Sequence, residues 1–170
     1  PHTSALASAE PSDAEIRKIA SLVLTQTMMG SEDIAHFSVK PAPNRVEVSL
    51  EQVFRAKDRI YIRYSVANQT AAPFRVTTPE VCLPLPTVQS VSLVSLRDHQ
   101  LAPQTFADFK AKPGSNLAVM QGESAHRDLL PGEKTTGVIS IESSAGNAPQ
   151  IYQLSFGTDQ SGPLKVEAVL

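Results

Sequence analysis

The chain of 170 residues carries 15 lysines and arginines and 17 aspartates and glutamates, for a net charge of −2, and 41% of its residues are hydrophobic. This size fits one domain with a sizeable core. The balanced charge argues against the basic face that nucleic acid requires and against a polybasic stretch for an anionic membrane. No apolar stretch approaches the roughly twenty residues of a transmembrane helix.

The single cysteine, Cys82, excludes an internal disulfide. A reducing compartment would explain this, and so would an exported protein that uses no disulfides. The first residues, PHTSALASAEPSDAE, are small and polar, with no initiator methionine and no apolar targeting segment. We therefore expect a periplasmic or secreted chain from which a signal peptide has been removed.

A helix is predicted over residues 13–28, after an extended arm over residues 1–11. Ser12 and Glu15 have the spacing of a capping box, and Gly30 is a plausible stop. The helix has one apolar stripe at intervals of three and four residues, formed by Ile16, Ile19, Ala20 and Val23. We expect this stripe to pack on the chain's own domain, although it could instead present itself to a partner.

After the helix the apolar residues alternate with a period of two, as in the segment RIYIRYSVANQTAAPFRV at residues 59–76. The alternation predicts a half-buried strand, with Ile60, Ile62, Tyr64 and Val66 toward the core and Tyr61, Arg63 and Ser65 on the opposite, exposed face. Asn68 to Thr70 should form a turn before the chain returns at residues 74–76 as a hairpin. The same triplet matches a glycosylation sequon, but its turn role already explains the asparagine.

Further strands are predicted along the rest of the chain, with turns at residues 57–58, 130–133 and 159–162. Seven to nine short strands at this spacing predict a mostly β protein. We expect an immunoglobulin-like antiparallel β-sandwich over residues 31–170, with one N-terminal α-helix in the segment 1–30. The stronger candidate strands cover residues 46–50, 60–66, 74–76, 88–96, 137–142, 151–156 and 164–168, and the weaker candidates cover residues 34–39, 105–112 and 117–120.

The segment PEVCLPLP at residues 79–86 contains three prolines, each of which removes a ladder donor. This predicts an edge strand or a crossover and not a central strand. Val81, Leu83 and Leu85 would give it an apolar side. The segment is either an edge protected by proline or a strip on which a partner docks. We take these three residues, together with Tyr61 and Arg63, as the candidate binding residues.

No motif in the sequence indicates catalysis. None of the four histidines has metal-ligand spacing, no GxSxG elbow is present, and no glycine-rich loop precedes a helix. Cys82 lies between Val81 and Leu83 and resembles a small buried hydrophobe. We expect no enzyme activity, no metal and no cofactor. Tyr61 and Tyr152 could form a small stacking platform for carbohydrate, or simply cover apolar surface.

The order of these motifs resembles that of bacterial extracytoplasmic immunoglobulin-like domains, as in conjugative-transfer accessory proteins and small exported domains. The matching pieces are a strand, Asn-x-Thr, proline and strand at residues 60–76, and Leu-x-Pro-Gly-Glu with a strand at residues 130–141. The resemblance covers about residues 44–170. It implies a non-enzymatic domain that binds another envelope protein, and it carries over no functional residue.

The sequence thus favours an interaction or assembly module of the bacterial cell envelope. The alternatives are a hydrolase, or a domain that binds a small ligand or carbohydrate, with a site assembled from residues distant in sequence. A small-ligand β-barrel is a third possibility. A cleft lined by Glu and His together would favour an enzyme, whereas a flat face with an unpaired edge strand would favour a binder.

Overall fold

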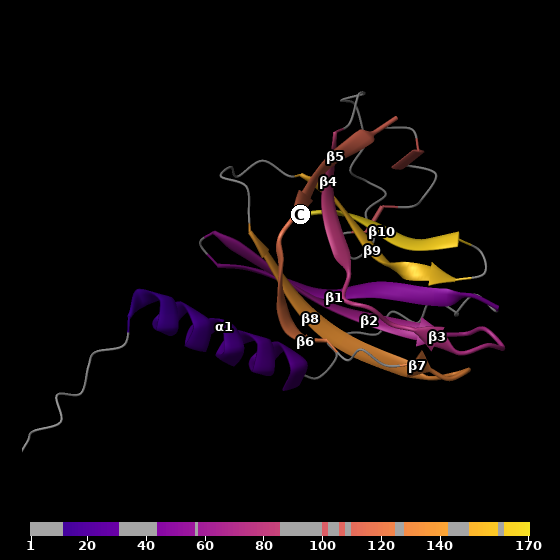
Figure 1. Cartoon of the computed structure of the whole chain (residues 1–170), viewed down its shortest axis with the longest axis horizontal. Coiled ribbons are helices and arrows are strands. Elements are labelled where there is room, and N and C mark those ends of the chain that lie inside the picture. Colours follow the sequence, from indigo (N-terminus) through magenta and orange to yellow (C-terminus); the bar gives the residue numbers. More distant parts are fainter. Residues whose placement is uncertain are drawn as a thin grey trace, which may run out of the picture.

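A computed structural model of the chain describes residues 12–30, 44–56, 58–85, 100–101, 106–107, 110–124, 128–142, 150–159 and 162–170. The described part is mostly β, as predicted, with the helix at its N-terminal end (Figure 1). The strands predicted at residues 34–39 and 88–96 lie outside the described residues.

Helix α1 (Asp13–Gly30) begins where the sequence predicts, because a capping box closes its first turn. The Ser12 backbone N–H and hydroxyl donate to Glu15 Oε2 at 2.8 and 2.9 Å, and the Glu15 N–H donates back to Ser12 Oγ at 3.4 Å. These donors favour the carboxylate and lower the pKa of Glu15. The cap is therefore confirmed, and the helix extends to Gly30.

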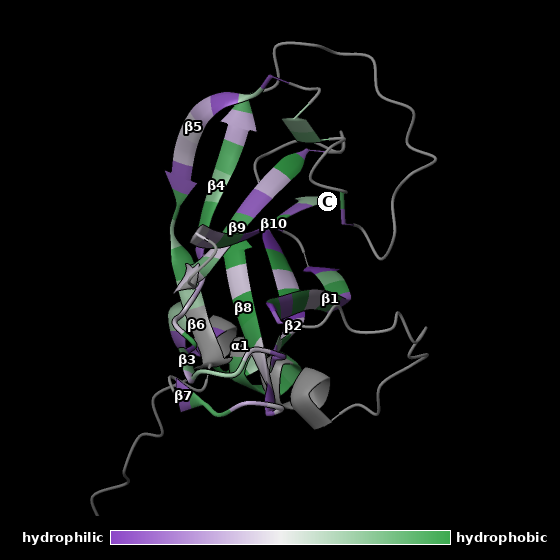
Figure 2. Ribbon diagram, turned by 90° about the vertical axis from the view of Figure 1, so that its right-hand side faces the viewer, coloured by the Kyte–Doolittle hydropathy of each residue, from purple (hydrophilic) through white to green (hydrophobic). Residues whose placement is uncertain are grey.

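The strands form two antiparallel four-stranded sheets and one small two-stranded sheet. The first sheet has the order β1 (Val46–Ala56), β2 (Arg59–Asn68), β8 (Lys134–Glu142), β6 (Val119–Ser124). The second has the order β10 (Gly162–Val169), β9 (Ile151–Asp159), β4 (Glu80–Leu85), β5 (Lys112–Leu117). The small sheet pairs β3 (Phe74–Arg75) with β7 (Asp128–Leu129). Figure 2 shows β5 and β6 along one side of the molecule and β10 and β1 along the other.

One hydrophobic core joins the two large sheets. Burying each aliphatic side chain contributes about 1.5–3 kcal/mol. The Tyr64 ring meets Phe156 of β9 edge to face, with the ring centroids 4.9 Å apart. A Cβ on Gly137, which pairs with Tyr64, would press against the tyrosine hydroxyl, so glycine makes room for this ring. The predicted inward residues of β2 are confirmed in this core: Ile60, Ile62, Tyr64 and Val66.

A β-bulge in β1 changes which of its residues face the core. The register runs from Leu50 opposite Tyr64 to Gln52 opposite Arg63, which leaves Glu51 as the extra residue. Before the bulge, Leu50 is buried in the core. After it, Val53 packs against the core and Phe54 is exposed on the opposite face.

Asn68, at the end of β2, is fully buried and uses all the hydrogen-bonding capacity of its side-chain amide. Its Nδ2 donates to the carbonyl oxygens of Ala72 and Leu129 at 2.8 and 2.9 Å. Its Oδ1 accepts from the backbone N–H and hydroxyl of Thr70 at 3.0 and 2.7 Å. The asparagine thus shapes the turn that follows it and ties that turn to β7. Since Nδ2 is occupied and buried, the sequon cannot accept a glycan in this fold.

The predicted turn at residues 130–133 is confirmed, and it also rests on Asn68. Glu133 N–H donates to the Leu130 carbonyl at 3.0 Å, and Gly132 has a φ of 82° after Pro131, as a type II turn requires. Gly132 N–H donates to the Asn68 carbonyl at 2.7 Å, and Asn68 N–H donates to the Glu133 carbonyl at 2.9 Å.

Two predictions about pairing and local structure are wrong. Residues 59–76 do not form a hairpin, because β2 pairs with β1 and β8 while β3 pairs with β7. The bonds of Asn68 hold the turn against β7 and direct the chain away from β2. The strand predicted at residues 105–112 includes Phe106 and Ala107, which are helical, and β5 begins only at Lys112.

Replacing Asn68 with aspartate tests this hydrogen-bond network. Asn68→Asp at pH 7 removes both donors and turns a carboxylate toward two carbonyl oxygens. We expect it to lower the free energy of unfolding by at least about 3 kcal/mol in a urea titration. The matched change at the exposed Asn44 should stay within about 0.5 kcal/mol. Equal effects of the two substitutions would contradict the central role of Asn68.

Candidate functional site

The segment with three prolines is not an edge strand at its start. Residues Glu80 to Cys82 of β4 pair with β9, and β4 pairs with β5 on its other side. The edge prediction is therefore wrong for this stretch. Pro84 is tolerated because it lies beyond the last residue paired with β9 and inside the register shift opposite β5, where no ladder donor is needed.

The three apolar residues of β4 do not share one surface. Val81 is only 2% exposed and belongs to the core, and Leu83 packs against the core while partly buried. Leu85 is 61% exposed. Of the predicted docking strip, Leu85 is thus the residue that a partner could reach, and its role in binding stays a prediction.

Tyr61 and Arg63 face the outer side of the first sheet, as predicted, but their expected exposure is wrong. They are 4% and 5% exposed. Helix α1 lies over this side and contacts β8, β6 and β2. Leu24 of α1 packs against Tyr61 and Val138. The helix therefore packs on its own domain, and it covers a sheet face that the alternation of β2 had predicted to meet water.

Arg63 is neutralised on this covered face by Glu51, the extra residue of the β1 bulge. Arg63 Nε lies 3.2 Å from Glu51 Oε2, and Lys134 Nζ lies 3.0 Å from Glu51 Oε1. The Arg63–Glu51 contact meets the distance of an ion pair but falls short of hydrogen-bond geometry between these two atoms, so we treat it as ionic. Three strands, β1, β2 and β8, are joined by this network.

Tyr152 is fully buried in the core, whereas Tyr61 lies under α1 on the opposite face of the first sheet. The two rings cannot form a common stacking platform. The carbohydrate surface considered from the sequence is therefore wrong.

Removing the buried arginine should destabilise the protein more than its predicted exposure implied. Arg63→Ala leaves Glu51 in a largely buried position without its buried cationic partner and with only the more exposed Lys134, and we expect a loss of about 1–3 kcal/mol in the free energy of unfolding. Arg75→Ala is the matched control, because Arg75 is 73% exposed in its ion pair with Asp128. That change should cost at most about 1 kcal/mol. Chemical denaturation of both variants measures the difference, and a smaller effect at Arg63 would refute the buried pair.

One cross-strand row on the outer side of the first sheet ends in exposed apolar residues. Phe54 pairs with Tyr61, Tyr61 with Ser140, and Ser140 with Met120, across all four strands. The two central members are buried, while Phe54 and Met120 at the ends are 46% and 50% exposed. The helix thus covers the middle of the row and leaves both ends open.

Helix α1 also exposes apolar residues of its own. Of the seven exposed large hydrophobic residues among the described residues, five lie on α1 or on the outer side of the first sheet. We call these five the helix-face patch: Ile19, Leu22, Val23, Phe54 and Met120. The sequence predicted Ile19 and Val23 as an apolar stripe, but Leu24 makes the contact with the sheet.

Cys82 belongs to a polar row on the second sheet. Its Sγ donates to Gln153 Oε1 at 3.7 Å, and Gln153 Nε2 donates to Glu167 Oε1 at 2.9 Å. Burial raises the pKa of the Cys82 thiol above its ordinary value of 9.0; the charge of Lys165 opposes this effect in part, and that of Glu167 adds to it. Since the thiolate is the nucleophile, this arrangement suppresses reactivity.

Iodoacetamide should therefore alkylate Cys82 more slowly than a cysteine peptide at pH 8. A raised pKa leaves a smaller thiolate fraction at that pH, and the rate should continue to rise above pH 9.0. Mass spectrometry follows the reaction, with the denatured protein as control. A faster reaction of the folded protein at pH 8 would mean that the thiol is activated.

Within the part of the chain that the structure describes, no three His, Cys, Asp or Glu residues come together in a way that could hold a metal ion. The four histidines considered from the sequence lie outside the described residues. Among the described helices, none has the length and apolar character needed to cross a membrane. Comparison with protein-family models, with curated proteins and with solved structures finds no match to this chain.

Proposed function

We propose that this chain is a non-enzymatic interaction or assembly module of the bacterial cell envelope, with an immunoglobulin-like β-sandwich as its scaffold. The strand order supports the fold. The two sheet orders are those expected if β1, β2, β4, β5, β6, β8, β9 and β10 correspond to immunoglobulin strands A, B, C, C′, D, E, F and G. In that fold one sheet has the order ABED, and the other contains C, F and G with room for C′.

The observation that carries the proposed function is the helix-face patch. Single exposed apolar residues are ordinary on a protein surface, but their concentration on one face is typical of an interaction site. Three of the five lie at neighbouring positions of α1, and the others lie at the two ends of the row that α1 crosses. An enzyme would instead gather polar groups in a cleft.

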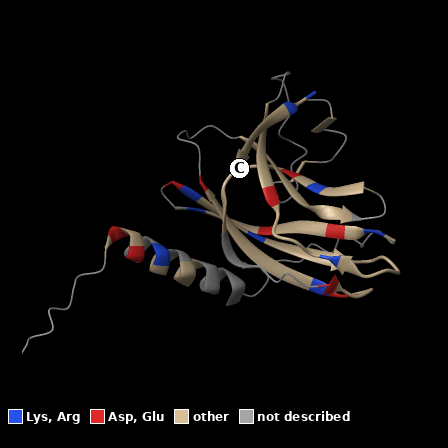
Figure 3. Ribbon diagram, viewed as in Figure 1, with Lys and Arg blue, Asp and Glu red and all other residues tan. Residues whose placement is uncertain are grey.

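The charges around the patch indicate the chemistry of its partner. Asp13 and Glu15 lie in the first turn of α1, and the cap keeps Glu15 ionised. Lys18 follows on the next turn, and Arg59 donates from Nη1 to Met120 Sδ at 2.7 Å. Figure 3 shows charges of both signs distributed over the helix and strands. A partner protein with an apolar surface and a polar rim of mixed charge fits this pattern.

Photo-crosslinking tests the proposal. A benzoylphenylalanine at position 22 should give a discrete covalent adduct with one envelope protein, identified by mass spectrometry. The same probe at position 85, equally accessible but on the second sheet, should give none. The double variant Ile19→Ser, Val23→Ser should reduce the adduct at position 22 by at least about tenfold.

Two further outcomes decide between surfaces. An adduct at position 85 alone would move the interface to β4, as the sequence first suggested. The absence of an adduct at both positions would count against an interaction module. Leu24→Ser separates docking of the helix from binding, because it should lower the unfolding midpoint whereas Leu22→Ser should not.

A further inference from the structure

The two lateral sides of the molecule differ in how their sheet edges are closed. Strands β1 and β10 are the edges on one side, and β6 and β5 are the edges on the other (Figure 2). Edge strands present backbone donors and acceptors that can pair with another chain. The coverage of each side therefore determines where another chain can add to a sheet by strand pairing.

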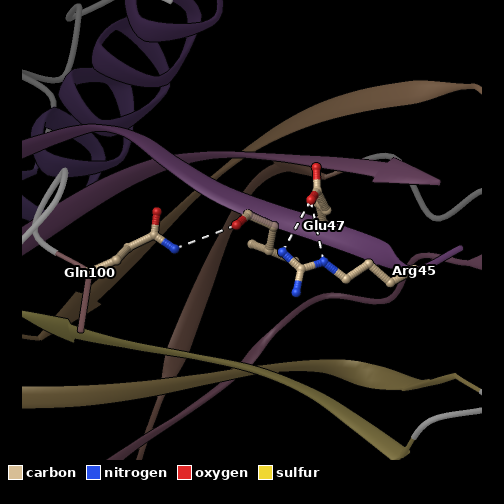
Figure 4. Close-up of polar contacts among 4 residues, drawn as sticks. Arg45, Glu47 and Gln100 are labelled. Atoms are coloured by element: carbon tan, nitrogen blue, oxygen red, sulfur yellow. Dashed lines mark hydrogen bonds and ion pairs between the residues drawn. The ribbon is translucent and has the colours of Figure 1, made fainter. Parts of the chain in front are cut away.

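Gln100 and Leu101 cover part of the side formed by β1 and β10. Gln100 forms a bridge with Ala168 of β10, and Leu101 N–H donates to the Glu167 carbonyl at 2.8 Å. The Gln100 side-chain amide reaches across to β1 (Figure 4). It accepts from Leu50 N–H at 3.1 Å and donates to the Val48 carbonyl at 3.4 Å. The amide thus offers β1 the donor and acceptor that a neighbouring peptide group would offer.

The opposite side has no such closure among the described residues. The chain runs along the edge of the second sheet as β5, passes Ala118, and continues along the edge of the first sheet as β6. Within the described part of the chain, β5 pairs with β4 alone and β6 with β8 alone. Residues 112–124 therefore form one continuous edge that spans both sheets.

Only the ends of this edge carry features that block strand pairing. Lys112, Pro113 and Gly114 lie at a register shift, and a Cβ on Gly114 would overlap the Leu83 carbonyl. A second register shift lies between Gln121 and Ser124. The intervening stretch, SNLAVMQ at residues 115–121, has no charge and no proline. Charges, prolines and bulges are the usual protection of an edge, so this stretch is unprotected.

The stretch is close to self-complementary around Ala118. In an antiparallel pairing of two copies centred there, Leu117 lies opposite Val119 and Ser115 opposite Gln121. The same register sets Asn116 opposite Met120, so no like charges face each other across the paired stretch. The two-fold axis at Ala118 also matches the point where the chain changes sheets, so that β5 of each copy lies along β6 of the other.

We propose that a second copy of this chain binds along residues 115–121, giving a two-fold dimer joined by antiparallel strand pairing. Leu117 and Val119 pack against the core at the junction of the two sheets and are only partly buried. Pairing would cover the remaining exposed surface of these two side chains and would supply hydrogen-bond partners to the backbone groups of the edge. Such an interface uses the same patch on both copies. This inference rests on the proposed function in one respect: the dimer would be the assembly that the proposed role includes.

Charge substitution at the axis tests the dimer, because position 118 of each copy faces its own equivalent. Ala118 is exposed, so the variants should remain folded. Ala118→Lys alone and Ala118→Glu alone should each weaken dimerisation by at least about tenfold, because like charges lie opposite each other. An equimolar mixture of the two should recover the dimer. Sedimentation velocity gives the mass, and circular dichroism checks the fold.

Ala20→Lys, at an exposed alanine of α1, is the matched control and should leave the dimer intact. A dimer that persists in Ala118→Lys but is lost in Ala20→Lys would place self-association on the helix face and overturn the proposal. A wild-type protein that stays monomeric up to about 1 mM would also overturn it. In that case a retained adduct at position 22 would leave the proposed function standing.

Discussion

The structure depends most on the buried side-chain amide of Asn68. Its two donors and its acceptor are all used, by Ala72, Leu129 and Thr70. Its backbone N–H and carbonyl hold the turn that leads into β8. A buried amide without partners would cost about 1–3 kcal/mol, so the surrounding turns and the asparagine stabilise one another. This one residue determines that β2 ends where β3, β7 and β8 meet.

The features that the sequence predicted correctly are those set by neighbouring residues. The capping box of Ser12 and Glu15, the alternation along β2 and the hydrogen bond between Leu130 and Glu133 each involve residues within a few positions of one another. The burial of Arg63 could not be predicted in this way. The burial of Arg63 depends on the bulge that places Glu51 beside it and on a helix from a distant part of the chain. Alternation indicates which side a residue faces, but not what covers that side.

The prolines of β4 also show that a local sequence pattern does not determine how a strand pairs. The number of prolines in residues 79–86 argued for an edge, yet pairing on both sides is possible because Pro84 falls where the ladder to β9 has already ended. Since β4 is not an edge strand where it pairs with β9, the candidate binding surface moves away from β4. Val81 belongs to the core, and the exposed apolar residues gather on the helix-bearing side, for which the sequence offered only the helical stripe with Ile19 and Val23 as a second possibility.

The helix face and the open edge share Met120, which ends the row on the first sheet and lies within the unprotected stretch. In the dimer, Asn116 of the second copy would lie opposite Met120 and extend the row with a polar residue. Dimerisation would then cover one end of the helix-face patch and leave Phe54 and the exposed side of α1 accessible. Because the two-fold pairing uses the same edge of both copies, strand pairing along residues 115–121 would stop at two copies and would not continue into a fibre.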